Sequence, residues 1–196
     1  MDDPSSIGKF IFLIVLMILS GFFSGSETAL MAVSKVKLHQ LAKNGKKRAL
    51  TVKKIISKPD KLLGTVLIGN NLVNIAASSI ATAVAIEFFG KAGVGIATGV
   101  MTLAILIFGE ITPKTLAAYA SERFSMSVAK PISMLMVILG PVVIVLNKIT
   151  NIILLPFSNL KASYNQKISA TEEEIRTMVD VSMEEGEIKP SEKDMI

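Results

Sequence analysis

An all-α integral membrane protein is predicted by three features of this sequence of 196 residues. Hydrophobic residues make up 51% of the chain, and only 19% of residues are charged. The mean hydropathy of +0.56 is rare in a soluble domain of this length. Long uncharged runs alternate with basic stretches. The predicted fold has three transmembrane helices, a broken juxtamembrane or re-entrant helix pair, and a cytosolic acidic helix.

The residue types present exclude several classes of site. Without cysteine there is no disulfide, thiol nucleophile or thiolate metal ligand. The single histidine, His39, leaves little room for imidazole zinc sites or Ser-His-Asp catalysis. The sequence has no phosphate-binding glycine loop and no paired carboxylates arranged for hydrolysis. We therefore predict that the chain is not an enzyme and that oxygen atoms hold any bound metal.

Three spans are predicted, at residues 7–33, 62–88 and 92–120. The second contains an uncharged run of 25 residues, 62–86, and at about 1.5 Å per residue such a run crosses a hydrocarbon core of roughly 30 Å. Asp2-Asp3 precede the first span where a signal peptide would be basic, so we expect this span to be retained. The short link between the last two predicts an antiparallel hairpin, with the N-terminus outside the cell.

Positive charge is concentrated in the loop after the first span. Residues 34–61 hold ten Lys or Arg, which predicts a cytoplasmic location. Apolar residues recur at roughly helical spacing on both sides of Asn44-Gly45, so we expect two amphipathic helices on the anionic inner leaflet. Without aromatic residues for base stacking, this loop is predicted to contact the lipid bilayer and not nucleic acid.

A broken helix pair is predicted at residues 125–157, because Gly140-Pro141 interrupts an apolar stretch. Pro141 lacks the N–H that continues a helix. Each half is too short to span alone, so a bent pair that keeps the C-terminus cytoplasmic is favoured over a fourth span. The predicted transmembrane domain is then 1–157. Residues 158–196 form a linker and an acidic cytosolic helical segment.

Polar clusters interrupt all three predicted spans, and each costs free energy in hydrocarbon unless it is satisfied. The first cluster contains Ser24, Ser26 and Glu27. Gly21 and Gly25, four residues apart, offer a surface on which another helix can approach closely. In the alternative interpretation, the serines only pack helices and Glu27 lies in the interface among the lysines of the next loop.

The second cluster places Asn70, Asn71 and Asn74 within five residues. Spacings of three and four residues bring their amides to one side of a helix. Amide oxygens are neutral ligands for a cation that must later leave. One buried asparagine usually bonds a neighbouring helix, and three in one span are explained less well in that way.

The third cluster comprises Gly109, Glu110, Pro113 and Lys114. Pro113 has no N–H, so the Gly109 carbonyl loses its helical donor and is predicted to be available to a ligand. Glu110 adds negative charge. Together the clusters supply an all-oxygen set suited to Mg²⁺, Ca²⁺ or Na⁺. Alternatively, Pro113 only kinks the helix while Lys114 pairs with Glu110 or snorkels to the interface.

These clusters resemble the signatures of the CorB/CorC and cyclin M (CNNM) magnesium transporter family. The resemblance is carried by FFSGSETA at 22–29, IGNNLVN at 68–74 and GEITPK at 109–114, in the family's order. It covers about residues 7–157. Residues 171–188 resemble the acidic linker that precedes paired CBS domains in this family.

The resemblance implies a multi-pass homodimer in the plasma or inner membrane. It implies transport of Mg²⁺, most simply export, by alternating access and in exchange for Na⁺. Regulation by Mg-ATP would belong to the CBS domains, which this chain lacks. The alternative function is a non-transporting membrane anchor or sensor for the missing cytosolic domains.

Carried over residue by residue, the resemblance implies an ion site made by side chains and one backbone carbonyl. Its members are Ser24 or Ser26, Asn70, Asn74, Glu110 and the carbonyl of Gly109. Asn71 and Glu27 match the motifs and either bind the ion or orient its ligands. Structural or gating roles are expected for Glu27, Pro113, Lys114, Gly140 and Pro141.

Overall fold

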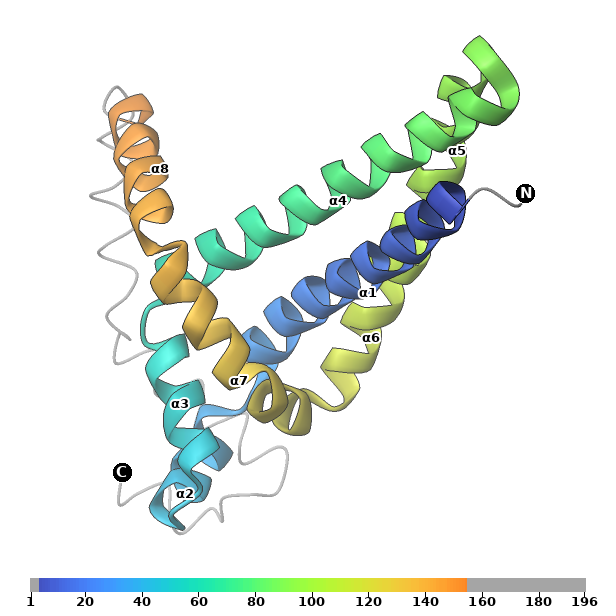
Figure 1. Ribbon diagram of the computed structural model, residues 1–196. Coiled ribbons are helices and arrows are strands. Elements are labelled where there is room, and N and C mark those ends of the chain that lie inside the picture. Colours follow the sequence, from blue (N-terminus) through green and yellow to red (C-terminus); the bar gives the residue numbers. More distant parts are fainter. Residues whose placement is uncertain (1–3, 155–196) are drawn as a thin grey trace, which may run out of the picture. The chain divides into compact units, whose positions relative to one another are not determined.

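The computed structural model describes residues 4–154, and every secondary-structure element in this range is a helix (Figure 1). The predicted all-α fold is thus confirmed. Residues up to Leu146 belong to one compact unit, and the last turns of α8 belong to a second unit that begins at Asn147. The end of the predicted helix pair, 155–157, and the predicted acidic segment, 158–196, lie outside the described residues.

The elements follow one another with few intervening residues. In chain order they are α1 (Pro4–Ala32), α2 (Lys35–Lys43), α3 (Lys47–Ile56), α4 (Pro59–Phe89), the 3₁₀ helix η1 (Gly90–Ala92), α5 (Gly93–Ala104), the π-helix η2 (Ile105–Ile111), α6 (Thr112–Tyr119), α7 (Ser121–Ile138) and α8 (Gly140–Ile153).

Two helical stretches in the described range are long and apolar enough to cross a membrane, Ile7–Ala32 and Pro59–Tyr119. The second has 61 residues and reverses at η1, where Gly90 adopts a φ of 60° that favours glycine. After the reversal, Gly93 lies against the Ala85 carbonyl, where a side chain would overlap. The 61 residues therefore form a hairpin. Only 22% of the most apolar window of each stretch is buried, as suits side chains that face lipid.

The basic loop forms two short helices, α2 and α3, on either side of Asn44-Gly45, as predicted. Ser34 caps α2, because its hydroxyl accepts a hydrogen bond from the Lys37 N–H at 3.4 Å. Leu38 of α2 and Val52 of α3 are buried. These helices therefore pack onto the rest of the helical unit and leave their lysines exposed.

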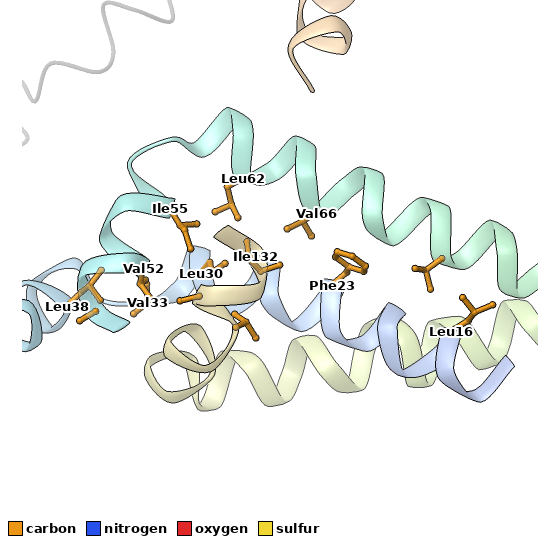
Figure 2. Close-up of a cluster of buried hydrophobic side chains, with 14 of the residues drawn as sticks. Leu16, Phe23, Leu30, Val33, Leu38, Val52, Ile55, Leu62, Val66 and Ile132 are labelled. Atoms are coloured by element: carbon orange, nitrogen blue, oxygen red, sulfur yellow. The ribbon is translucent and has the colours of Figure 1, made fainter. Parts of the chain in front are cut away.

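The core lies along α1, which packs against α4, η2, α6 and α7. Figure 2 shows it as a continuous row of apolar side chains from α2 and α3 to the α1–α4 interface. Its labelled members are Leu16, Phe23, Leu30, Val33, Leu38, Val52, Ile55, Leu62, Val66 and Ile132.

The α1–α4 interface depends on Gly69. A Cβ at Gly69 would overlap the ring of Phe23, which is only 7% exposed and cannot easily move. We expect Gly69→Ala to lower the free energy of unfolding by about 1–3 kcal/mol, as overpacked cores do. Denaturant unfolding in detergent measures this. Gly8→Ala is the control because nothing lies within 4 Å of its Cβ position. Equal losses in the two variants would contradict this packing.

The predicted break in the last apolar stretch is confirmed, because the helix axis bends by 66° between α7 and α8. Pro141 is the second residue of α8, where a missing N–H leaves no helical bond unmade. Gly64 of α4 allows α8 to approach, since a Cβ there would lie 2.8 Å from Val143 Cγ1. Whether this pair is re-entrant or spans the membrane stays a prediction.

Candidate ion site

Three contacts align α1 antiparallel to α4. Lys9 forms an ion pair with Glu87 near one end, Ser20 contacts Asn70, and Phe23 lies against Gly69. Residue numbers along this interface therefore rise in α1 as they fall in α4. Ser20 is near the middle of the apolar stretch Ile7–Ala32. The polar contact between α1 and α4 thus lies far from both ends of the apolar helices.

Ser20 joins three helical segments at this level. Ser20 is 1% exposed, and its hydroxyl donates a hydrogen bond to Asn70 Oδ1 of α4 at 3.4 Å. A Cβ on Gly109 of η2 would lie 2.6 Å from Ser20 Oγ, so only glycine lets the η2 backbone come this close. Our sequence analysis missed Ser20. The available signal was its position four residues before Ser24, on the same face of the helix.

Unpaired buried oxygens flank this contact. Among the described residues, the buried side-chain atoms without a hydrogen-bond partner are Ser24 Oγ, Thr65 Oγ1 and Asn74 Oδ1. Ser24 and Asn74 lie one turn beyond Ser20 and Asn70 on their helices, which in an antiparallel pair are opposite directions. Leaving such oxygens unpaired costs about 1–3 kcal/mol each. Their lone pairs are what a hard cation binds.

Two other predicted ligands are placed differently. The Ser26 hydroxyl is buried but donates to the Phe22 carbonyl of its own helix at 2.6 Å. Asn71 is exposed, because a step of one residue rotates it about 100° from Asn70. The structure therefore brings Ser24, Asn70 and Asn74 to the helical interior and leaves Asn71 at its surface.

Gly109 and Glu110 lie in the π-helix η2, which our sequence analysis did not anticipate. The Thr112 N–H donates to the Ile107 carbonyl, five residues earlier. Pro113 would be the donor to Gly109 in α-helical register and to Phe108 in π register, and it has no N–H. In either register, the carbonyl that this position would serve therefore loses its helical donor. Single π turns inside helices are frequent at functional sites.

Small residues of α1 let the Pro113 region approach closely. A Cβ on Gly21 would lie 3.1 Å from Pro113 Cγ, and a Cβ on Gly25 would lie 3.3 Å from the Pro113 carbonyl oxygen. The close-approach surface predicted for this glycine pair is confirmed. It presses the turn that follows η2 against the face of α1 that carries Ser24.

Charged groups are few near these oxygens. Glu110 is half-buried and makes no hydrogen bond or ion pair with another described residue. Lys114 Nζ lies 4.0 Å from Glu27 Oε2, so the lysine pairs with α1 and not with Glu110. That pair is about two-fifths exposed and contributes under about 1 kcal/mol. No cluster of three or more histidine or acidic residues occurs within residues 4–154. A cation here would rely on neutral oxygens and one carboxylate.

Comparisons with known proteins agree with the resemblance seen in the motifs. Residues 10–192 match the family described as the cyclin M transmembrane N-terminal domain. A UPF0053 protein of Haemophilus influenzae is 41% identical over 98% of this chain and 45% of its own length. The UPF0053 inner membrane protein YfjD of Escherichia coli is 40% identical over 91% of this chain and 41% of its own.

A chloroplastic DUF21 domain-containing protein of Arabidopsis thaliana is 37% identical over 94% of this chain and 28% of its own length. The chain thus spans less than half the length of these three relatives. The family match covers most of the sequence and all three polar clusters. The chain therefore belongs to the cyclin M (CNNM) family, as its transmembrane N-terminal domain.

Proposed function

We propose that this membrane domain transports divalent cations, exporting Mg²⁺ in exchange for Na⁺ by alternating access. The observation that carries the proposal is the meeting of Ser20, Asn70 and Gly109 in the middle of apolar helices. Unpaired buried oxygens of Ser24 and Asn74 flank this point. Polar groups left unpaired at such a depth are costly, and a cation that moves along the α1–α4 interface would satisfy them in turn.

The donor set fits the chemistry of a transported ion. Mg²⁺ gives up water reluctantly, so a dehydrated ion needs several oxygens in place of its hydration shell. Hydroxyl, amide and backbone carbonyl oxygens supply them without formal charge. Glu110 would neutralise part of the ion's charge and leave binding weak enough for release. Na⁺ accepts the same oxygen types, which supports a shared site for the coupling ion.

A pocket whose lining includes one serine and three threonines offers a continuation of the path beyond Asn74. Ser78 follows Asn74 by one helical turn and lines a pocket of about 320 Å³ between α4 and the α5–η2 run. The threonines Thr82, Thr98 and Thr102 also line it. We assign this pocket to the outward-facing half of the path, since it lies on the side of the site away from the basic helices.

The proposal includes the remaining expectations about location and assembly. The N-terminus is outside the cell membrane and the C-terminus is cytoplasmic, which places the lysines of α2 and α3 at the anionic inner leaflet. We further propose a homodimer. Gly95 and Gly99 of α5 have nothing within 4 Å of their Cβ positions, so this face is open to a second copy.

Calorimetry and ion flux test the proposal together. Titration of Mg²⁺ into the purified chain in detergent should show saturable binding at one site. Proteoliposomes should move Mg²⁺ against its gradient when a Na⁺ gradient is imposed, and should stop when Na⁺ is replaced by K⁺. Saturable Mg²⁺ binding without flux would contradict transport and favour an ion sensor. Mg²⁺ flux that does not depend on Na⁺ would contradict the exchange mechanism.

A non-transporting anchor or sensor is the second candidate, favoured by the Ser20–Asn70 hydrogen bond, which also serves as interhelical glue. It predicts that Asn70→Ala and Asn74→Ala lower stability without changing the response to ions. The transport hypothesis predicts instead that these two variants still fold but lose ion binding. Size exclusion and calorimetry on the same samples separate the two.

A further inference from the structure

A pocket lies where the basic helices meet the bent pair, and no residue of the polar clusters lines it. It has a volume of about 400 Å³ and is enclosed by residues from four helices of the same compact unit. Its polar wall carries Lys54, Lys58 and Lys61, from the end of α3 to the start of α4. Its apolar wall comes from the α7–α8 bend, including Val137 and Ile144.

The charge on the pocket is uncompensated. No acidic residue lines it, and none of its three lysines forms an ion pair with another described residue. Asp60 is adjacent in sequence but does not line the pocket. Lys61 is half-buried and its charge is unpaired, so an anion that enters the pocket meets no competing carboxylate there.

The opposite wall needs an apolar partner. Val137 is 77% exposed, and Ile144 is 46% exposed. Neighbouring large apolar residues of the bend, Met134 and Ile138, are exposed as well. A cationic wall facing an apolar wall complements a molecule that carries one anionic group next to a hydrocarbon chain. Inorganic phosphate or an acidic peptide would satisfy only the lysines.

We propose that this pocket binds an anionic phospholipid, with the phosphate against Lys54, Lys58 and Lys61 and the acyl chain along Val137 and Ile144. The bound lipid would join the start of α4 to the α7–α8 bend, since Gly140 and Pro141 also line the pocket. Gly140 and Pro141, which the sequence marks for a structural or gating role, would then act as part of a lipid site. This proposal does not depend on ion transport.

Native mass spectrometry on the detergent-purified chain tests this assignment. The probes are dioleoyl phosphatidylglycerol and dioleoyl phosphatidylcholine, which share acyl chains and differ in headgroup charge. We expect about tenfold tighter binding of the anionic lipid by the wild type. The triple variant Lys54→Gln/Lys58→Gln/Lys61→Gln should bring that ratio to about one. Val137→Ser should weaken both lipids and keep the ratio.

The matched control is Lys43→Gln/Lys46→Gln/Lys47→Gln, which removes the same charge from exposed lysines outside the pocket. It should keep the tenfold ratio. An equal loss of the ratio in this control would overturn the proposal, because the lipid would then be attracted by the net positive charge of the helices and not by the pocket.

If glycerol phosphate at equal concentration displaces the lipid, the pocket binds free phosphate and not a lipid. If the wild type binds no lipid and Glu172→Gln/Glu173→Gln/Glu174→Gln does, the chain's own acidic segment is the occupant of the pocket and the proposal is wrong. If the pocket triple fails to fold by size exclusion, Lys54→Gln alone carries the test.

Discussion

Replacing Glu110 by glutamine is expected to weaken Mg²⁺ binding by at least about 100-fold, because it removes the one carboxylate of the proposed donor set. Glu110 is half-buried and has no described partner, so its carboxylate is not committed to an ion pair whose loss would disturb the fold. Stability should change by less than about 1 kcal/mol. Calorimetric titration of Mg²⁺ gives the affinity, and thermal unfolding of the ion-free sample gives the stability.

Glu122→Gln is the matched control for that experiment. Glu122 is also half-buried, but it lies at the start of α7, where it lines a pocket with Lys37 and Arg123. Its variant should bind Mg²⁺ within about twofold of the wild type, since it is outside the proposed donor set. Unchanged binding by Glu110→Gln, or an equal loss in both variants, would remove Glu110 from the site.

Replacing Ser24 by alanine should separate ion binding from helix packing. The Ser24 hydroxyl is fully buried and has no hydrogen-bond partner in the described residues. Removing it breaks no hydrogen bond within the described residues, so the stability of the ion-free protein should stay the same or rise by about 1 kcal/mol. Mg²⁺ affinity should fall by about tenfold, as expected when one neutral ligand is lost.

Ser26→Ala provides the comparison, because Ser26 is equally buried but already donates to the Phe22 carbonyl. It should leave Mg²⁺ affinity within about twofold and cost up to about 1 kcal/mol of stability, for the lost hydrogen bond. The opposite pattern, with Ser26→Ala losing affinity and Ser24→Ala losing stability, would exchange the roles of the two serines. A stability loss in both with no change in affinity would favour the anchor.

Much of this architecture could be predicted from local sequence. Long uncharged runs specify helices that can cross a bilayer, and the clustered lysines mark the helices that follow α1. Gly140-Pro141 specified a break because proline cannot continue a helix. The Asn70 and Asn74 pair also followed from helical spacing. Each of these inferences depends on residues that are neighbours along the chain.

The features that escaped prediction depend on contacts between distant segments. Ser20 lies within an apolar run and gains importance only because Asn70 and Gly109 come to meet it. Lys114 is four residues from Glu110 and could pair with it, yet its ion pair is with Glu27 of α1. Asn71 shares its motif with two interior asparagines but is exposed. A list of the polar residues in these motifs therefore overstates how many can face one ion.

The π-helix η2 determines where the chain can lose a residue. A π turn holds about one residue more than an α turn, and in an α-helix each residue corresponds to about 100° of rotation. Deleting a single residue such as Ile107 would restore ordinary winding without turning α5 against α6, because the wide turn had absorbed the extra residue. A deletion within the α-helical part of α5, for example of Leu103, would instead turn the buried Ala97 and Met101 by about 100° toward lipid. The fold should therefore tolerate the loss of one residue in η2 and not in α5.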